Sequence, residues 1–203
     1  MAPRKYILGK RSESIEDMRR RIVDATVELH SEKGVLATSM QDVAERANVA
    51  LRTVYNHYPT IEDLVGGCGQ KVIEILSPPT PTIFDGLTTV EERMLKLVRE
   101  LFAMYERGSV QLEVARCEQS KVAGLADFVT NERVLRNELV GEALRPFEVR
   151  RGARKEIVVL TDYYVWKAFA EENLTTHQAV KAVYRSLMAV AYPEAVGEKG
   201  RGK

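Results

Sequence analysis

The sequence has few cysteines, and their placement excludes two common uses of that residue. Only Cys68 and Cys117 occur among the 203 residues, which is too few for a framework of disulfides. Neither has another cysteine or a histidine within four residues, so the ligand spacing of a zinc finger is absent. We therefore expect reduced, structural thiols in a cytoplasmic protein. An oxidant sensor is the alternative, and the spacing gives it no support.

Several other features are missing. No apolar run approaches the roughly 18–20 residues that cross a membrane, and residues 1–14 carry charges without the apolar core of a secretory signal. The three histidines lie singly, and no glycine-rich phosphate loop or His-Glu-x-x-His motif occurs. Because no nucleophile–base arrangement and no ligand spacing is visible, the sequence predicts no enzyme, no cofactor, no metal site and no membrane partner.

Positive and negative charges are balanced over the whole chain, but positive charge predominates in its first residues. The net charge is +1, which excludes a uniformly basic coat for nucleic acid. Residues 1–21, however, contain seven basic and three acidic side chains, so this segment alone carries +4. A basic arm on a neutral body is suited to a polyanion such as DNA. The alternative is a solvated terminus that leads into a charged helix.

What the sequence does contain is helical periodicity. Hydrophobic residues make up 45% and charged residues 29%, as in ordinary soluble domains, and apolar positions recur at helical spacing along most of the chain. The pattern predicts an all-α protein, with helices over 15–33, from 38, over 51–58, from 60, over 88–106, 110–117, 125–149 and 154–171, and from 175 to just before Pro193.

Three of these helix starts carry the capping-box pattern. In this pattern a Ser or Thr side chain and a Glu or Gln three positions later satisfy each other's backbone N–H groups. The predicted pairs are Thr38 with Gln41, Thr88 with Glu91, and Thr175 with Gln178.

Two of the short helices form a motif that can read DNA. They are joined by a tight turn and preceded by a longer helix, as in a helix-turn-helix, whose second helix lies in the major groove. In that helix, residues 51–58, Val54 and Tyr58 are four positions apart and face the core. The side chains that then point away are Arg52, Thr53, Asn56 and His57.

The exposed side chains have suitable chemistry for DNA. Arginine can read guanine and asparagine can read adenine, which assigns base contacts to Arg52 and Asn56. Hydroxyl and imidazole donors suit phosphates, and this describes Thr53, Tyr55 and His57. The alternative is three small packing helices with polar exposed faces.

A family resemblance sharpens this interpretation. Residues 37–59 read ATSMQDVAERANVALRTVYNHYP and resemble the DNA-binding domain of the tetracycline-repressor (TetR) family, with its Val-Ala pair, tight turn and Thr-x-Tyr-x-His pattern. The resemblance covers about residues 15–65, and the rest of the chain matches only in length and helical plan. It implies operator DNA as a partner, phosphate contacts from Thr38, Ser39, Tyr55 and His57, and base contacts near Met40, Leu51, Arg52 and Asn56.

Three positions depart from the family's pattern. Asn48 stands where glycine is usual, and asparagine tolerates the left-handed conformation that the turn needs. Ala50 replaces the serine that usually caps the second helix, a loss of about 0.5–2 kcal/mol. Ile61 replaces a lysine that binds phosphate, so we assign no DNA contact to Ile61. Arg52 and the basic arm could compensate for that loss.

The remaining helices predict a second domain that pairs with another copy of the chain. In the predicted helix 154–171, apolar side chains fall on nearly every side, which requires cover on both faces, and one small domain covers only one. The last helix carries an apolar stripe suited to a four-helix dimer core. A homodimer through the last two helices is therefore predicted, in line with the resemblance. The alternative is burial within a monomer.

Aromatic side chains of this domain are candidates for an effector pocket. Tyrosine and tryptophan supply the few polar groups that an otherwise apolar ligand site needs, so the effector is expected to be small and apolar or amphipathic. The alternative is ordinary packing in the core. The candidate residues are Phe102, Tyr105, Phe128, Tyr163 and Trp166.

Gly66, Gly67 and Gly69 fall within the fourth predicted helix. Each costs about 0.5–1 kcal/mol relative to alanine in a helix interior, so a reason for them is expected. One reason is a hinge that transmits effector binding. The alternatives are a helix that stops at Val65 and restarts near Gln70, and glycines that let a neighbour approach.

Together these features predict a basic flexible arm (1–14), a helix-turn-helix DNA-binding domain (15–65), a helical effector-binding and dimerisation domain (66–193) and a disordered tail (194–203). We expect a ligand-responsive transcriptional repressor that binds a pseudo-palindromic operator as a homodimer and is released by an effector. One alternative is a ligand-independent helix-turn-helix activator or architectural protein. An all-α enzyme is the alternative from a different class, and the sequence offers it no catalytic arrangement.

Overall fold

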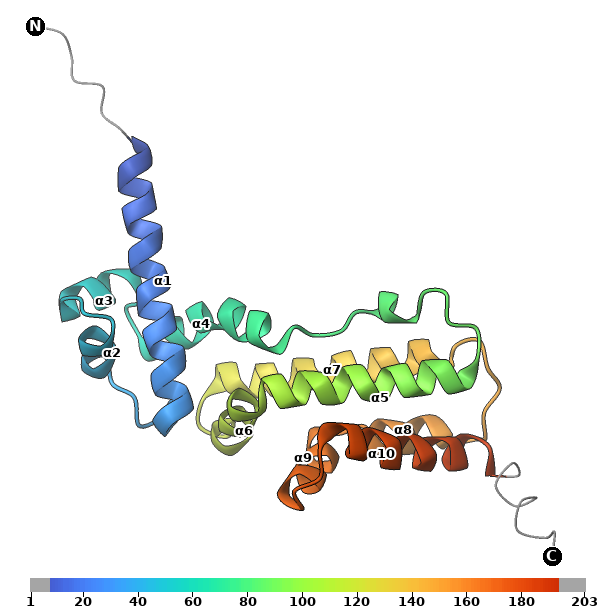
Figure 1. Ribbon diagram of the computed structural model, residues 1–203. Helices are drawn as coiled ribbons and strands as arrows, with labels where there is room; N and C mark the ends of the chain where they lie inside the picture. The colour runs from blue at the N-terminus through green and yellow to red at the C-terminus, as the bar shows by residue number, and fades with distance from the viewer. Residues whose placement is uncertain (1–7, 194–203) are drawn as a thin grey trace, which may run out of the picture. The chain divides into compact units, whose positions relative to one another are not determined.

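The computed structural model confirms the predicted all-α fold (Figure 1). It describes the backbone of residues 8–193 and the side chains of residues 15–193, and the backbone it describes contains no strand. The elements are α1 (Leu8–Lys33), α2 (Met40–Arg46), α3 (Leu51–His57), α4 (Ile61–Leu76), the short 3-10 helix η1 (Pro81–Phe84), α5 (Val90–Arg107), α6 (Ser109–Glu118), α7 (Ala123–Leu144), α8 (Ala153–Leu160), α9 (Tyr163–Glu171) and α10 (Thr176–Ala191).

The helices group into two compact units. The first runs to Ile75 and also takes in Val110–Asp127, which contains nearly all of α6. The second comprises Leu76–Ser109 and the chain from Phe128 onward. The predicted boundary between residues 65 and 66 therefore falls inside α4, and the assignment of 66–193 to effector binding and dimerisation stays a prediction.

The ends of the chain differ in part from expectation. The helix α1 begins at Leu8, seven residues before the predicted start, so residues 8–14 of the predicted arm have helical backbone. The rest of that arm, residues 1–7, and the predicted tail, residues 194–203, lie outside the described residues.

The core of the first unit is made by the faces of α1, α2, α3 and α4 that the periodicity selects. Its central residues come one from each of these helices and have no exposed surface: Ile22, Val43, Val54 and Leu64. In the second unit, α10 packs against α5, α8 and α9. The Arg93 guanidinium of α5 is buried and donates to the carbonyl oxygens of Glu142 and Ala143, which ties α5 to α7.

Two of the three predicted capping boxes are wrong by one position. The box of α2 pairs Ser39 with Asp42, and that of α5 pairs Thr89 with Glu92. Thr38 is unsuited to this role because its buried hydroxyl donates to the Gly34 carbonyl oxygen at 2.7 Å. At both sites two hydroxyl residues stand side by side; at α5 the pattern allowed either register, whereas at α2 the partner is an aspartate, which the Glu or Gln pattern does not include. The predicted box of Thr175 at α10 is confirmed.

The predicted helix 154–171 is wrong, because it divides into α8 and α9 at Thr161 and Asp162. The Asp162 carboxylate accepts the Tyr164 N–H at 2.9 Å and so caps α9, and it also pairs with Arg136 of α7. The interruption leaves apolar side chains in solvent, since Val159 is 64% exposed and Tyr164 is 56% exposed. The preceding helix also ends earlier than predicted, at Leu144 rather than at residue 149.

The helix α4 is continuous through its three glycines, so the interpretation that it stops at Val65 and restarts near Gln70 is wrong. A Cβ on Gly67 would lie 2.4 Å from the Tyr58 ring, whereas a Cβ on Gly66 or Gly69 would meet no atom within 4 Å. Close approach of a neighbour therefore accounts for Gly67 alone.

Candidate nucleic-acid interface

The turn between α2 and α3 is fixed by backbone geometry and by one arginine. Asn48 has a φ of 51°, the left-handed conformation that the sequence predicts for this position. The next residue, Val49, donates its N–H to the Ala44 carbonyl oxygen at 3.0 Å. The Arg21 guanidinium of α1 donates to the carbonyl oxygens of Ala47 and Asn48 at 2.5 and 3.0 Å. The angle at which α3 leaves α2 is therefore held by α1.

The helix α3 presents the predicted face to solvent. Val54 is fully buried and Tyr58 is 5% exposed, which confirms that these two residues face the core. No side chain caps the start of α3 at Ala50, as the missing serine implies. On the outer side Arg52, Tyr55 and Asn56 are exposed, and Thr53 and His57 are half-buried.

Three further residues that are predicted to contact DNA are buried or half-buried. Met40 is 6% exposed and belongs to the core of the first unit, and Leu51 packs against that core. Thr38 is also 6% exposed, with its hydroxyl proton committed to Gly34. Ser39 is exposed, and its hydroxyl binds Asp42. The sequence motif gives the positions of these residues but does not show which of them are buried in the core.

Ion pairs neutralise much of the positive charge around α2. Arg46 pairs with Glu28 and Glu32 at 3.2 and 2.8 Å, and these carboxylates raise the pKa of Arg46 further. Lys33 pairs with Asp42 at 2.8 Å, and this ammonium, together with Ser39, holds the pKa of the Asp42 carboxyl well below its usual range. Arg52 is left as the exposed cation on α3 that no described carboxylate pairs with.

A contact that sequence reasoning missed joins α6 to the end of α1. The Glu118 carboxylate accepts the N–H groups of Val35 and Leu36 at 2.8 and 3.2 Å. The backbone at Gly34 is left-handed, with a φ of 87°, and a Cβ there would lie 2.4 Å from a Glu118 oxygen. No sequence signal pairs positions that are 83 residues apart.

His30 lies in α1 near the same contact. Burial lowers the pKa of His30 to about 4, against an opposing effect of the Glu118 charge. Its Nε2 atom is buried and has no hydrogen-bond partner among the described residues. The imidazole is therefore neutral at physiological pH.

The second unit brings four of the five predicted effector-pocket residues together. The ring centroid of Tyr105 lies 5.7 Å from that of Tyr163, 6.4 Å from Trp166 and 6.1 Å from Phe102. These four side chains are buried, and we call them the aromatic cluster. Phe128 is half-buried and takes no part in these ring contacts among the described side chains.

A polar network borders the aromatic cluster. The Tyr105 hydroxyl donates to a Glu132 carboxylate oxygen at 2.8 Å and also lies 3.1 Å from the Thr161 carbonyl oxygen. Burial, and then the Glu132 charge, raises the pKa of Tyr105 well above its ordinary value. Arg136, whose Nε lies 3.6 Å from Glu132, completes the network with Asp162. The cluster therefore has one polar end inside the unit.

The described residues offer neither a membrane-spanning helix nor a cluster of metal ligands. None of the helices within residues 8–193 combines the length and apolar character of a membrane span. Within the described side chains, no group of three or more His, Cys, Asp or Glu residues is placed to hold a metal ion.

Part of the first unit is similar to a known protein family. A family profile described as "Bacterial regulatory proteins, tetR family" matches residues 22–68, which span the end of α1 to the middle of α4. Over these residues the chain is similar to that family. The resemblance seen in the sequence over residues 15–65 is thereby confirmed.

Curated relatives match over part of the chain. The chain is 41% identical over 61 residues to the HTH-type transcriptional repressor KstR of Mycolicibacterium smegmatis, a match that covers 30% of each chain. It is 45% identical over 49 residues to KstR of Rhodococcus jostii, which covers 24% of this chain and 23% of the relative. The match thus spans less than a third of the length of these curated relatives.

Solved structures match over both units. A transcriptional regulator from Rhodococcus sp. Rha1 superposes with a TM-score of 0.65 at 13% identity, over 86% of this chain and 96% of that one. The tetR-like regulator LfrR from Mycobacterium smegmatis, in complex with proflavine, superposes with a TM-score of 0.55 at 23% identity, over 85% and 96%. SmeT in complex with triclosan gives 0.64 at 16% identity, over 85% and 90%. At these identities the likeness shows a shared fold.

Proposed function

We propose that this protein is a transcriptional repressor that binds operator DNA through α3 as a homodimer and is released by a small-molecule effector. The observation that carries the proposal is the α2–turn–α3 geometry of a segment similar to the tetR family, with Arg52 and Asn56 exposed on the outer face of α3. An exposed helix that follows such a turn fits the major groove. The KstR relatives are named as transcriptional repressors, which supports repression over activation.

The exposed residues divide into base-reading and phosphate-binding groups. Arg52 presents a guanidinium that can donate two parallel hydrogen bonds to guanine, and Asn56 presents an amide that matches adenine. Thr53, Tyr55 and His57 supply donors for phosphates on either side of the groove. Met40 and Leu51 are assigned to the core instead of to bases, because both pack with it.

Few uncompensated cations remain on the described part of the first unit, so the basic arm gains importance for affinity. Arg46 and Lys33 are both neutralised by carboxylates. Residues 1–11 contain four basic side chains and no acidic one. Each phosphate that they neutralise would release counterions, which makes binding stronger and more dependent on salt.

Exposed apolar side chains support the homodimer. Val159 of α8 and Tyr164 of α9 leave large apolar surfaces in solvent within one chain. In a dimer with two-fold symmetry, equivalent surfaces of the two copies face each other, so the second copy would cover both residues. The dimer would place two α3 helices for the two half-sites of a pseudo-palindromic operator.

The aromatic cluster supports an effector site in the second unit. Its rings are buried against one another beside the Tyr105 hydroxyl and the Glu132 carboxylate, so a ligand that enters between these side chains would meet apolar rings and one polar end. Two proteins of the same fold have been solved in complex with small aromatic molecules, SmeT with triclosan and LfrR with proflavine. By analogy, an aromatic compound with one polar group is the class of effector proposed here.

The proposal is tested first by selecting DNA. Full-length protein would be used to enrich binders from a pool of random duplexes, and the enriched sequences would be read. A pseudo-palindrome with two half-sites about one helical turn or slightly more apart is expected. Enrichment of single, unpaired sites would contradict the dimeric mode, and absence of any enrichment would contradict DNA reading by α3.

The effector is tested with the selected operator. Trp166 is the one tryptophan of the chain and belongs to the aromatic cluster, so its fluorescence reports on ligands bound there. Triclosan and proflavine serve as probes, with triclosan monitored by fluorescence and proflavine by calorimetry because it absorbs and emits light itself. A probe that binds the protein should also weaken operator binding. Binding without any change in operator affinity would favour a ligand-independent regulator.

A further inference from the structure

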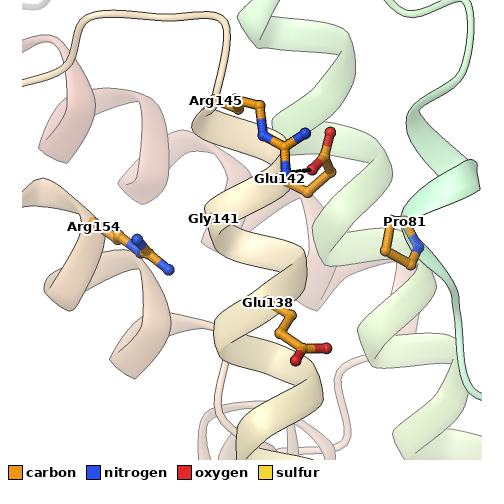
Figure 2. A pocket seen from close by; sticks show the side chains of 6 residues that line it. All are labelled: Pro81, Glu138, Gly141, Glu142, Arg145 and Arg154. Carbon is orange, nitrogen blue, oxygen red and sulfur yellow. Dashed lines mark ion pairs between the residues drawn. The ribbon is translucent and has the colours of Figure 1, made fainter.

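A surface cavity in the second unit has no part in the proposed function. It has a volume of about 580 Å³ and lies along α7, with η1 and α8 at its sides (Figure 2). This volume is within the range of about 300–1,000 Å³ that is typical of small-molecule sites. Its lining differs from the aromatic cluster because four of the six lining residues are charged: Pro81, Glu138, Gly141, Glu142, Arg145 and Arg154.

Arg154 is held at the cavity by the backbone of α7. Its Nη2 atom donates to the Asn137 carbonyl oxygen at 3.3 Å. A Cβ on Gly141 would lie 2.7 Å from the same nitrogen, so the guanidinium occupies space that only glycine leaves free. No carboxylate of the described residues pairs with Arg154, so its other N–H groups remain available to a ligand.

Glu138 supplies the opposite charge on α7. It lies three residues before Gly141 and therefore on the same side of the helix. Within residues 15–193 its carboxylate makes no hydrogen bond and no ion pair. Figure 2 shows Arg154 reaching toward α7 from α8, while the Glu138 carboxylate points away from it. Both residues line the same cavity, and no ion pair joins them among the described side chains.

The other two charged residues are already satisfied. Glu142 pairs with Arg145 at 2.6 Å and with the buried Arg93 at 3.5 Å. Arg93 is anchored in turn by backbone carbonyl oxygens, and Glu142, Arg145 and Arg93 together carry one net positive charge. One unmet cation and one unmet anion therefore remain at the cavity.

We propose that this cavity binds a small zwitterion, with its carboxylate on Arg154 and its ammonium on Glu138. The planar guanidinium forms paired, charge-assisted hydrogen bonds with a carboxylate, and these are stronger than bonds between neutral groups. A ligand with one charge would leave either Arg154 or Glu138 without a partner. A zwitterion of the right length satisfies both.

The proposal is tested by calorimetric titration of the full chain with three molecules of one skeleton: 4-aminobutyrate, butyrate and butylamine. Glycine and 6-aminohexanoate extend the series to a shorter and a longer separation of charges. At least one of the three zwitterions should bind tenfold or more tightly than both butyrate and butylamine. If no zwitterion exceeds the two singly charged compounds, the proposal is refuted.

Variants separate the two charges. Arg154→Gln should weaken binding of the best zwitterion at least tenfold and leave binding of butylamine unchanged. Glu138→Gln should also weaken binding of the best zwitterion at least tenfold, but it should leave binding of butyrate unchanged. Gly141→Ala should weaken binding less than Arg154→Gln does, because the new methyl group shifts the end of an exposed, flexible side chain but leaves its charge in place. The matched controls are Lys155→Gln and Glu148→Gln, exposed neighbours outside the cavity lining. Undiminished binding by Arg154→Gln would overturn the assignment.

The same variants test the competing occupant, a second copy of the chain. Analytical ultracentrifugation of Arg154→Gln and Glu138→Gln should give the same association state as the wild type. A shift toward monomer in both variants, combined with no zwitterion binding by the wild type, would assign Arg154 and Glu138 to an interface between copies and overturn the proposal.

Discussion

Alanine substitutions at the three glycines of α4 should change the stability of the protein in opposite directions. The sign depends on whether the new methyl group meets the Tyr58 ring. A Cβ at residue 67 would lie 2.4 Å from Cε1 of Tyr58 and 3.0 Å from its Cζ, whereas Cβ atoms at Gly66 and Gly69 meet nothing within 4 Å. All three positions are inside one continuous helix. Alanine at residues 66 and 69 therefore gains helix propensity alone, about 0.5–1 kcal/mol each.

The cost at residue 67 follows from how firmly the ring is held. Tyr58 is 5% exposed and belongs to the core of the first unit, and the Arg19 guanidinium lies 5.9 Å from the ring centroid on one face. A ring in such a place moves only by disturbing its neighbours, which costs about 1–3 kcal/mol. After the propensity gain, Gly67→Ala should destabilise the protein by about 0–2.5 kcal/mol.

The measurement is the free energy of unfolding in urea, followed by circular dichroism, for Gly66→Ala and Gly67→Ala side by side. The two variants should differ by about 1–3 kcal/mol, which is about 2–12 °C in melting temperature for a protein of this size. The difference isolates the contact, because both substitutions add the same methyl group to the same helix.

A second background identifies the tyrosine as the cause. In Tyr58→Leu the close contact with the ring is gone, so Gly67→Ala should become as stabilising there as Gly66→Ala is in the wild type. If Gly67→Ala already stabilises the wild type as much as Gly66→Ala does, the close approach does not exist and the reasoning is refuted.

Four further predictions concern function and pH. Arg52→Ala should cost about 1–3 kcal/mol of operator binding and relax discrimination at one base pair in competition with single-base operator variants; an equal loss on all sequences would make Arg52 a phosphate contact. Removal of residues 1–11 should flatten the slope of log K against log salt by up to about 0.9 for each lost contact, and an unchanged slope would show that the arm does not bind. Gly66→Ala with Gly69→Ala should weaken the effect of an effector on operator affinity if α4 is a hinge; intact coupling would place the signal elsewhere. Because the pKa of His30 is about 4 when folded, against an ordinary value of 6.5, the unfolded chain binds the extra proton first, so stability should fall as pH drops from about 6.5 to 4, and His30→Gln should remove part of that fall.

The pH experiment has a matched control in the same chain. His177→Gln removes an exposed imidazole from the first turn of α10 and leaves the buried His30 in place. The signal to compare is the free energy of unfolding at several pH values, with a slope of at most about 1.4 kcal/mol per pH unit from a single proton. Equal slopes in His30→Gln and the wild type would show that the imidazole is not buried as described.

The sequence by itself determined the features that depend on neighbours within about one helical turn. Apolar spacing predicts the all-α fold, and the four-residue separation of Val54 and Tyr58 correctly predicts which side of α3 is buried. Asn48 takes up the left-handed turn conformation for a reason contained in its own side chain. These outcomes follow from local sterics and periodicity, which any stretch of sequence carries with it.

Only the tertiary structure decided the features that join distant segments. The break between α8 and α9 occurs where Asp162 meets Arg136 of another helix, and a pattern of apolar residues does not reveal that partner. Glu118 caps the end of α1 from 83 residues away, and Gly67 is required by a ring that packs beneath it. Met40 fits the spacing of a DNA contact yet lies in the core. In each case the outcome depends on a contact between groups that are distant in sequence and meet only when the chain packs. Such a contact produces no periodic pattern in the sequence.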